Sequence, residues 1–309
     1  MVTYYRLHRF VVSITKRHRY DSVPAIPLAK LRERNLVFTV TAGRTGTLFA
    51  QLFALLPDTT SVHEPAPTFH AYLRRIKRDH DFAKKFLLYY KLPFIAAVPS
   101  RNYVEFSHVF CKGFLEPLLE LGLIPNLLLF WRPPRLIALS YFERNVVPER
   151  TFYGLQFLLS PRHRDTLPLP AWRHMTDYQL IFWYALEIER RHCEYSRLVR
   201  AAGGAVCDVT ANDLRDFERF VDIIKNLSLL SPDVHLDTLR SQHAANCAIS
   251  WNKNFHPLRK HRGDLDAEEE QVWQAISVTN RQLRSSIERR YNGLGGSPET
   301  GIISPQCCL

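Results

Sequence analysis

The amino-acid sequence predicts an α/β fold in which a parallel β-sheet is flanked by helices. Short, apolar, β-branched runs alternate along the chain with longer stretches that have a helical pattern. The 309 residues have an apolar fraction of 46%, which is enough for one large core. No internal repeat or long linker divides them. We therefore expect a basic N-terminal arm over residues 1–30, one domain over 31–292 and a flexible tail over 293–309.

Five short apolar runs are predicted as strands, and the run at 127–131 is the most apolar of them. Strands that are buried on both faces form continuous apolar runs, so the sheet is expected to be covered on both sides. The predicted strands are residues 36–41, 60–63, 109–112, 127–131 and 206–209.

Helices are predicted between and after these strands. Residues 151–175 are rich in proline, glycine and aromatic residues and are expected to form an ordered loop region, and 246–266 a polar basic loop. The predicted helices are residues 48–56, 79–90, 116–121, 134–145, 177–200, a helix from about 212, and 266–291.

The charge balance favours an anionic partner. The chain has 41 Lys and Arg against 30 Asp and Glu, a net charge of +11. A nucleotide, a nucleic acid, a sulfated or phosphorylated acceptor, or a membrane surface would all suit this surplus, and a merely solvated basic surface is the alternative. In the basic arm, the apolar run 10–14 is flanked by Arg and Lys, which would suit contact with a membrane surface or organelle targeting.

The cysteines and the hydropathy bear on location. None of the six cysteines forms a Cys-x-x-Cys pair, which favours a reducing compartment over a disulfide framework or a zinc site. No run approaches the roughly 18–20 apolar residues that span a bilayer. We therefore expect a cytoplasmic protein, with organelle targeting by the arm left open.

A short glycine loop follows the first predicted strand and precedes a helix. Its sequence is Gly43-Arg44-Thr45-Gly46-Thr47. Glycines let the backbone approach an anion, and the N–H groups at a helix start face negative charge. The loop lacks the spacing and the lysine of a Walker A motif.

A second candidate anion site follows the strand at 127–131. Arg132 stands at the strand end, where open α/β sheets bind ligands, and Ser140 is about two turns along the next helix. A guanidinium fork and a hydroxyl can converge on one phosphate.

Together these two segments resemble the family of sulfotransferases that use PAPS (3′-phosphoadenosine 5′-phosphosulfate), over roughly residues 35–145. The resemblance implies a P-loop NTPase-like sulfotransferase fold, PAPS as donor with PAP as product, and no metal. It places the loop from Gly43 to Leu48 on the 5′-phosphosulfate, and Arg132, Arg135 and Ser140 on the 3′-phosphate. Pro133 departs from the family, which usually has Asp there.

Glu64, at the end of the second predicted strand, is the candidate general base. Its position resembles the Golgi-type, tyrosylprotein and bacterial branches of the family more than the cytosolic branch, which uses a histidine. Burial beside Pro65, Pro67 and Phe69 is expected to raise its pKa and improve it as a base. His63 is the rival base.

Further cations are expected around the donor. Arg44 would balance the charge on the leaving group. Lys112, expected at a strand end, resembles the family's Lys-Thr-Pro segment and would neutralise the transferring sulfonate. Arg259, Lys260 and Arg262 resemble the late basic loop that closes over the nucleotide in this family.

The acceptor is less specified: a carbohydrate, phenol, tyrosine, peptide or lipid hydroxyl, or an amine. An aromatic pocket is one possibility, but aromatic residues on helices more often belong to the core. The candidates for such a pocket are Phe152, Tyr153, Trp172, Tyr178 and Trp183. Nothing in the sequence indicates an oligomeric state.

Two other functions compete with this one. A phosphotransferase that uses ATP would fit a basic cleft, with Asp208 at the end of a strand to bind magnesium. A non-enzymatic module for nucleic acid or membrane surfaces would need its basic residues on one face. The basic residues are instead spread along the chain without a nucleic-acid motif, so no nucleic-acid partner is expected.

Overall fold

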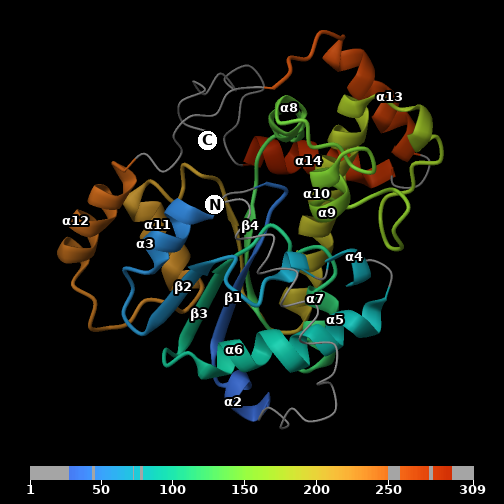
Figure 1. Ribbon diagram of the computed structural model, residues 1–309. Helices are drawn as coiled ribbons and strands as arrows, with labels where there is room; N and C mark the ends of the chain where they lie inside the picture. The colour runs from blue at the N-terminus through green and yellow to red at the C-terminus, as the bar shows by residue number, and fades with distance from the viewer. Residues whose placement is uncertain are drawn as a thin grey trace.

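A computed structural model describes residues 28–43, 46–71, 73–76, 79–249, 258–277 and 281–293. Its centre is a five-stranded sheet with the order β2-β3-β1-β4-β5, in which every neighbouring pair is parallel (Figure 1). This confirms the α/β prediction. The strands are β1 (Asn35–Val40), β2 (Thr59–His63), β3 (Asn102–Phe106), β4 (Asn126–Phe130) and β5 (Val206–Val209).

The register brings the carboxyl ends of four strands to one edge of the sheet. Val40 of β1 pairs with Leu129 of β4, and His63 of β2 pairs with Phe106 of β3. The segments that follow β2, β3, β1 and β4 therefore leave the sheet side by side, in that order.

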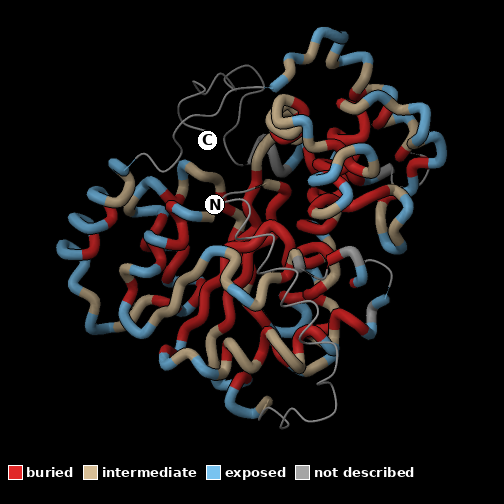
Figure 2. The backbone as a smooth tube through the Cα atoms, in the orientation of Figure 1, coloured by how far each residue is buried: buried red, intermediate tan, exposed pale blue. Residues whose placement is uncertain are grey.

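Helices cover both faces of the sheet because alternate strand residues point to opposite sides. Leu36, Phe38 and Val40 belong to one core cluster and Val37 to the other. The three central strands β1, β3 and β4 are almost entirely buried, and Figure 2 shows the centre of the molecule in red. One face is covered by α3 (Thr47–Phe53), α11 (Phe217–Asn226) and α12 (Leu236–Cys247), the other by α5 (His80–Phe86), α6 (Leu92–Ala97), α7 (Leu115–Glu120), α8 (Pro134–Glu143) and α10 (Asp177–Ala201).

The longest described helix, α10, runs through the second face. Thr176 caps it by accepting from the Gln179 N–H at 3.2 Å, and the Gln179 side chain accepts from Thr176 N at 2.8 Å. This reciprocal capping box fixes where the helix begins. The remaining elements are α2 (Leu28–Arg32), the 3₁₀ turns η1 (Phe69–Ala71) and η3 (Trp172–His174), α4 (Leu73–Ile76), the π-helical turn η2 (Leu87–Lys91), α9 (Phe152–Phe157), α13 (Leu265–Ser277) and α14 (Arg281–Gly293).

One predicted strand is wrong. Residues 109–112 form a buried turn, closed by a hydrogen bond from Lys112 N to Val109 O at 3.0 Å. The strand of this region is β3, whose Asn102 and Glu105 are buried and hydrogen-bonded. Because β3 contains buried polar side chains and the turn after it is apolar, hydropathy indicated a strand at the turn and not at β3.

Several helix boundaries also differ from the prediction. The helix expected from about residue 212 begins at Phe217, because Asp216 caps it by accepting from Arg219 N. The single helix expected over 266–291 is described as two, α13 and α14. The predicted arm overlaps α2, whose Leu31 is fully buried in the core. Residues 1–27 and 294–309 lie outside the described residues. Among the described helices, none combines the length and the apolar character that crossing a membrane requires.

Candidate functional site

The candidate site lies where four strands end at the same edge of the sheet. Glu64 follows β2, His108 follows β3, the glycine loop follows β1, and Arg132 follows β4. Residues from separate parts of the sequence thus share one edge, the usual place for a ligand in an open α/β sheet.

The start of the glycine loop is held by two tyrosines. The hydroxyls of Tyr141 on α8 and Tyr184 on α10 both donate to the carbonyl of Ala42, at 2.6 and 2.8 Å. Gly43 N donates to Thr41 Oγ1 at 3.3 Å. The loop therefore leaves β1 in a fixed direction. Arg44 and Thr45 lie outside the described residues, so their predicted roles stay predictions.

The other predicted loop residues are described. A Cβ on Gly46 would lie 1.9 Å from Cδ2 of His63, so only glycine fits below this imidazole. Thr47 Oγ1 lies 3.4 Å from His63 Nδ1. A Cβ on Gly43 would meet none of the described residues within 4 Å. The side chain of Leu48 is buried in the core, which leaves its backbone as the part that faces the loop.

Glu64 makes the closest contact of the site, with a histidine that sequence analysis missed. Its carboxylate Oε1 accepts a short hydrogen bond from Nδ1 of His108. Glu64 has a φ of 46°, a left-handed conformation that is uncommon outside glycine and is often found at functional sites. Its N–H also donates to Phe106 O at 3.2 Å. The polar residues Ser107 and His108 directly after β3 could have indicated this part of the site. They were overlooked because the strand was predicted at 109–112 instead.

The pKa of Glu64 moves in the opposite direction to the sequence prediction. Burial pushes this pKa up, but the hydrogen bond from His108 and the positive charges of His108, His63 and His70 outweigh burial and hold it at about 2. The carboxyl is therefore ionised across the physiological range, and the predicted rise in its pKa is wrong.

A buried ion pair between η2 and β3 holds the segment that follows Glu64. Lys91 and Glu105 are both fully buried, and Nζ of Lys91 lies 2.7 Å from Oε1 of Glu105. The ammonium also donates to Pro67 O at 3.2 Å, and Tyr103 donates to Glu105 at 2.5 Å. Burial lowers the pKa of Lys91 and raises that of Glu105, while their mutual attraction opposes both shifts.

Lys112 lies in the buried turn and not at a strand end. Its side chain is 1% exposed, and its Nζ donates to the carbonyl of Phe157 at 2.6 Å and lies 5.2 Å from the Tyr184 ring centre. This bond ties the end of α9 to the segment after β3. A role for Lys112 on the sulfonate stays a prediction.

The residues of the second predicted anion site lie on neighbouring segments. Arg132 comes two residues after β4 and Ser140 lies on α8, both half-buried, and their meeting at one phosphate stays a prediction. Arg135 instead pairs with Glu269 at 2.8 Å and with Asp266 on α13, and these carboxylates raise its pKa. Its charge is therefore already balanced, which argues against the phosphate contact expected for it.

The late basic loop docks on two helices of the second face. Leu258 N donates to Glu143 O at 2.8 Å, and Arg259 pairs with Asp177 at 2.9 Å. The Arg259 guanidinium also lies 3.7 Å from the centre of the Phe142 ring. Lys260 and Arg262 are exposed. The predicted basic loop therefore lies beside α8 and α10, and its Arg259 is already paired with a carboxylate.

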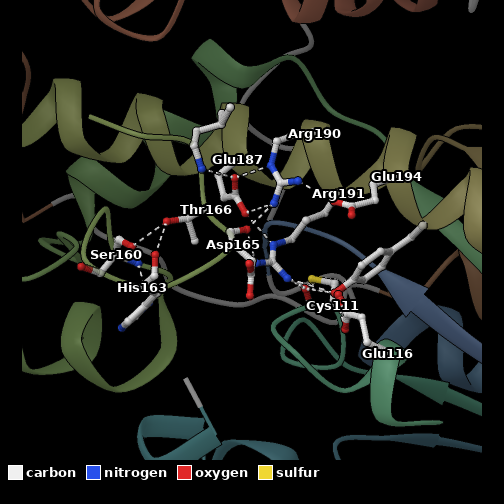
Figure 3. A network of polar contacts seen from close by, with 12 residues as sticks. Cys111, Glu116, Ser160, His163, Asp165, Thr166, Glu187, Arg190, Arg191 and Glu194 are labelled. Atoms are coloured by element: carbon white, nitrogen blue, oxygen red, sulfur yellow. Dashed lines mark hydrogen bonds and ion pairs between the residues drawn. The ribbon is translucent and has the colours of Figure 1, made fainter. Parts of the chain in front are cut away.

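A second polar network fixes the loop region after α9 (Figure 3). Glu187, fully buried on α10, accepts from Leu167 N at 3.0 Å and from Arg191 Nε at 2.6 Å. Arg191 also donates to Cys111 O at 3.0 Å. The network joins the turn after β3 and residues 160–167 to α10.

The predicted aromatic pocket divides into two groups. Tyr178 and Trp183 are 1% and 0% exposed and belong to the core. Trp172 is half-buried below Arg173. Phe152 and Tyr153 are exposed on α9.

No protein-family model matches the chain, and no curated protein matches it either. The functional argument therefore depends on the geometry of the residues. The described residues contain no group of three or more His, Cys, Asp or Glu side chains placed to hold a metal ion.

Proposed function

We propose that the protein is a sulfotransferase that moves a sulfuryl group from PAPS to an acceptor hydroxyl or amine. The observation that carries the proposal is the pairing of β1 with β4, with Val40 opposite Leu129. It puts the glycine loop and the Arg132 segment at neighbouring strand ends, as one donor with two anionic ends requires. A P-loop NTPase-like arrangement and a cytoplasmic location remain part of this proposal.

The described residues fit such a donor in three respects. Among the described residues nothing lies within 4 Å of a Cβ built on Gly43, which leaves room for a phosphosulfate beside the loop. Thr47 is exposed and offers a hydroxyl. Ser140 is half-buried on α8, the helix that follows the Arg132 segment, and would offer its hydroxyl to a phosphate. Arg135 and Arg259 fit less well, since carboxylates already pair with them.

When bound, PAPS would supply the activated sulfuryl group, and the protein would orient the acceptor and take its proton. Glu64 remains the proposed base, acting as a pair with His108. A carboxylate with a pKa of about 2 is a weak base by itself. The hydrogen bond between them would let the carboxylate and the imidazole share the proton of the acceptor as a pair. His63 lies over the loop and orients Thr47.

Calorimetry with PAP and with ATP, each with and without Mg²⁺, tests the donor. PAP should bind more tightly than ATP and without magnesium, and Ser140→Ala should weaken PAP more than ATP because ATP lacks the 3′-phosphate. Preference for magnesium–ATP would replace the proposal with a phosphotransferase. Salt-sensitive binding to a nucleic acid, with no affinity for PAP, would replace it with a binding module.

Transfer of labelled sulfate from PAPS to a panel of phenols, sugars, peptides, lipids and amines tests the reaction itself. Glu64→Gln and His108→Asn should each lower kcat by about 10²–10⁴-fold if the pair accepts the proton. Near-normal turnover in both variants would remove the pair from the mechanism. A loss confined to a His63→Asn variant would assign the base to His63.

A further inference from the structure

Backbone pairing between β1 and β3 ends before the chain reaches the candidate site. The last pair in the register is Phe38 with Glu105, two residues before Ser107. His108 comes directly after Ser107 and is the residue that hydrogen-bonds Glu64. The segment that leads to His108 is therefore held from the β1 side by contacts other than the backbone pairs of these two strands.

A threonine hydroxyl continues the pairing where the backbone hydrogen bonds stop. Oγ1 of Thr39 accepts from Ser107 N at 2.9 Å and donates to Ser107 O at 3.2 Å. One side chain thus binds both polar groups of the Ser107 backbone, as a neighbouring strand would. Thr39 and Ser107 are 1% and 3% exposed, so water does not compete for these two hydrogen bonds.

The peptide between Phe106 and Ser107 joins this threonine to Glu64. Its oxygen accepts from Glu64 N at 3.2 Å, and its N–H donates to Thr39. A peptide unit is planar and rigid, so a shift on its Thr39 side also moves the side that Glu64 contacts. The next peptide, which links Ser107 to His108, is held by Thr39 through its carbonyl. Thr39 therefore contacts the backbone that connects the two members of the Glu64–His108 pair.

The strand that carries Thr39 is a fixed support. β1 lies between β3 and β4 in the sheet, and Thr39 itself pairs with Leu128 of β4. The same strand leads into the glycine loop at Gly43. The position of His108 is thus referred to the strand from which the proposed donor site begins.

We propose that Thr39 is a positioning residue for the Glu64–His108 pair, because its hydroxyl fixes the backbone on both sides of Ser107 and so holds the His108 imidazole against the carboxylate. The inference rests on the proposed function for the transfer of a proton, whereas the placement of His108 can be measured without any substrate. Small errors in the placement of a reacting group lower the rate of a reaction strongly.

Proton NMR of the full chain tests the placement of His108. An imidazole N–H that donates to a buried carboxylate resonates far downfield of the amide protons. Glu64→Gln and His108→Gln should each remove this signal from the downfield region and thereby assign it. The test variant is Thr39→Val, which keeps the branched shape and removes the hydroxyl, and Thr39→Ser restores the hydroxyl as a rescue.

The matched control removes a buried hydroxyl from the other end of β3. Ser100 is 9% exposed just before this strand, and its Oγ hydrogen-bonds Thr60 Oγ1 at 2.7 Å and Asn102 O at 3.0 Å. Ser100→Ala should therefore perturb the same strand without touching the backbone next to His108.

We expect the downfield signal in the wild type, in Thr39→Ser and in Ser100→Ala, and its loss or upfield shift in Thr39→Val. In sulfate transfer, Thr39→Val should lower kcat about 10–100-fold and leave the KM for PAPS unchanged. Should Thr39→Val not fold, Thr39→Cys takes its place under the same criteria, because a thiol is a weaker hydrogen-bonding group than a hydroxyl.

Three results would overturn the proposal: an unchanged signal in Thr39→Val, equal changes in Thr39→Val and Ser100→Ala, or a lost signal with an unchanged kcat. The expected NMR pattern in a wild type that transfers no sulfate would leave the placement of His108 by Thr39 intact and remove the proposed function instead.

Discussion

The Glu64 carboxyl is where burial and charge oppose each other most directly in the candidate site. Burial alone would favour its neutral form, and the sequence context of prolines and Phe69 suggested that burial would prevail. Three histidines reverse the balance, and the one that donates the hydrogen bond, His108, is distant from Glu64 in sequence. A buried carboxyl beside donors is ionised because hydrogen bonds and nearby positive charge exceed the loss of hydration.

Replacing Glu64 with Gln should give a pH-dependent loss of stability. The folded pKa of about 2 lies below the ordinary value of 4.5, so the unfolded chain takes up the proton first as the pH falls. The stabilisation by Glu64 is therefore complete above about pH 4.5 and is lost between there and pH 2. Urea denaturation should show Glu64→Gln less stable by up to about 3 kcal/mol at pH 5.5, with a smaller difference at pH 3.

Two histidine variants serve as controls for this result. His108→Gln, which removes the hydrogen bond and its charge, should lose most of the same pH dependence. His63→Gln, which removes only a nearby charge, should lose less of it. A difference between wild type and Glu64→Gln that stays constant from pH 3 to 5.5 would contradict the lowered pKa.

Lys91 offers a second test at a single residue. Lys91→Met leaves Glu105 buried without its cation and removes the bond to Pro67 O, so we expect a loss of about 3–5 kcal/mol in the free energy of unfolding. Adding Glu105→Gln to Lys91→Met should recover part of it, because the unpaired charge is gone. The matched control is Lys84→Met, which breaks an exposed pair with Glu120 and should cost at most about 1 kcal/mol. Equal losses in Lys91→Met and Lys84→Met would show that the buried pair is not important.

At the scale of secondary structure, strands were predictable wherever hydropathy was the main signal. β1, β2, β4 and β5 differ from the predicted runs by at most one residue at either end. β3 was missed because Asn102 and Glu105 are polar yet buried, each with a partner from elsewhere in the chain. Hydropathy along the sequence cannot reveal a partner that lies elsewhere in the chain. His108 was therefore overlooked together with β3, the strand that positions it.

The placement of α9 gives a prediction at the same scale. Gly154→Ala would put a Cβ 1.7 Å from Val147 O, a backbone atom that cannot rotate away, so α9 must move. We expect a loss of about 1–3 kcal/mol in the free energy of unfolding, measured by urea denaturation. Gly43→Ala is the control and should be near neutral, because its Cβ would meet no atom of the described part of the chain within 4 Å.

For the whole molecule, the sequence predicted that strands and helices alternate but not how the strands are ordered. The order β2-β3-β1-β4-β5 arises from pairings between distant segments, such as Phe38 with Glu105 and Phe130 with Val209. This order is what brings Glu64, His108, the glycine loop and Arg132 to one edge. The sequence therefore indicated each candidate segment separately. Which segments lie next to one another depends on the strand order, which only the structure shows.

The proposed donor site between the ends of β1 and β4 leads to a prediction about the stability of the entire chain. A ligand that binds only the folded state raises the Tm, and it does so more when it binds more tightly or is more concentrated, so the Tm of the wild type should rise with the concentration of PAP. Ser140→Ala and Arg132→Met should each reduce this shift, since each removes one contact proposed for the 3′-phosphate. Arg219→Met serves as the control, because it removes a cation that is 55% exposed on α11 and pairs with Asp213. If Arg219→Met reduced the shift as much as Arg132→Met, PAP would be responding to the net charge of +11 and not to a site between β1 and β4.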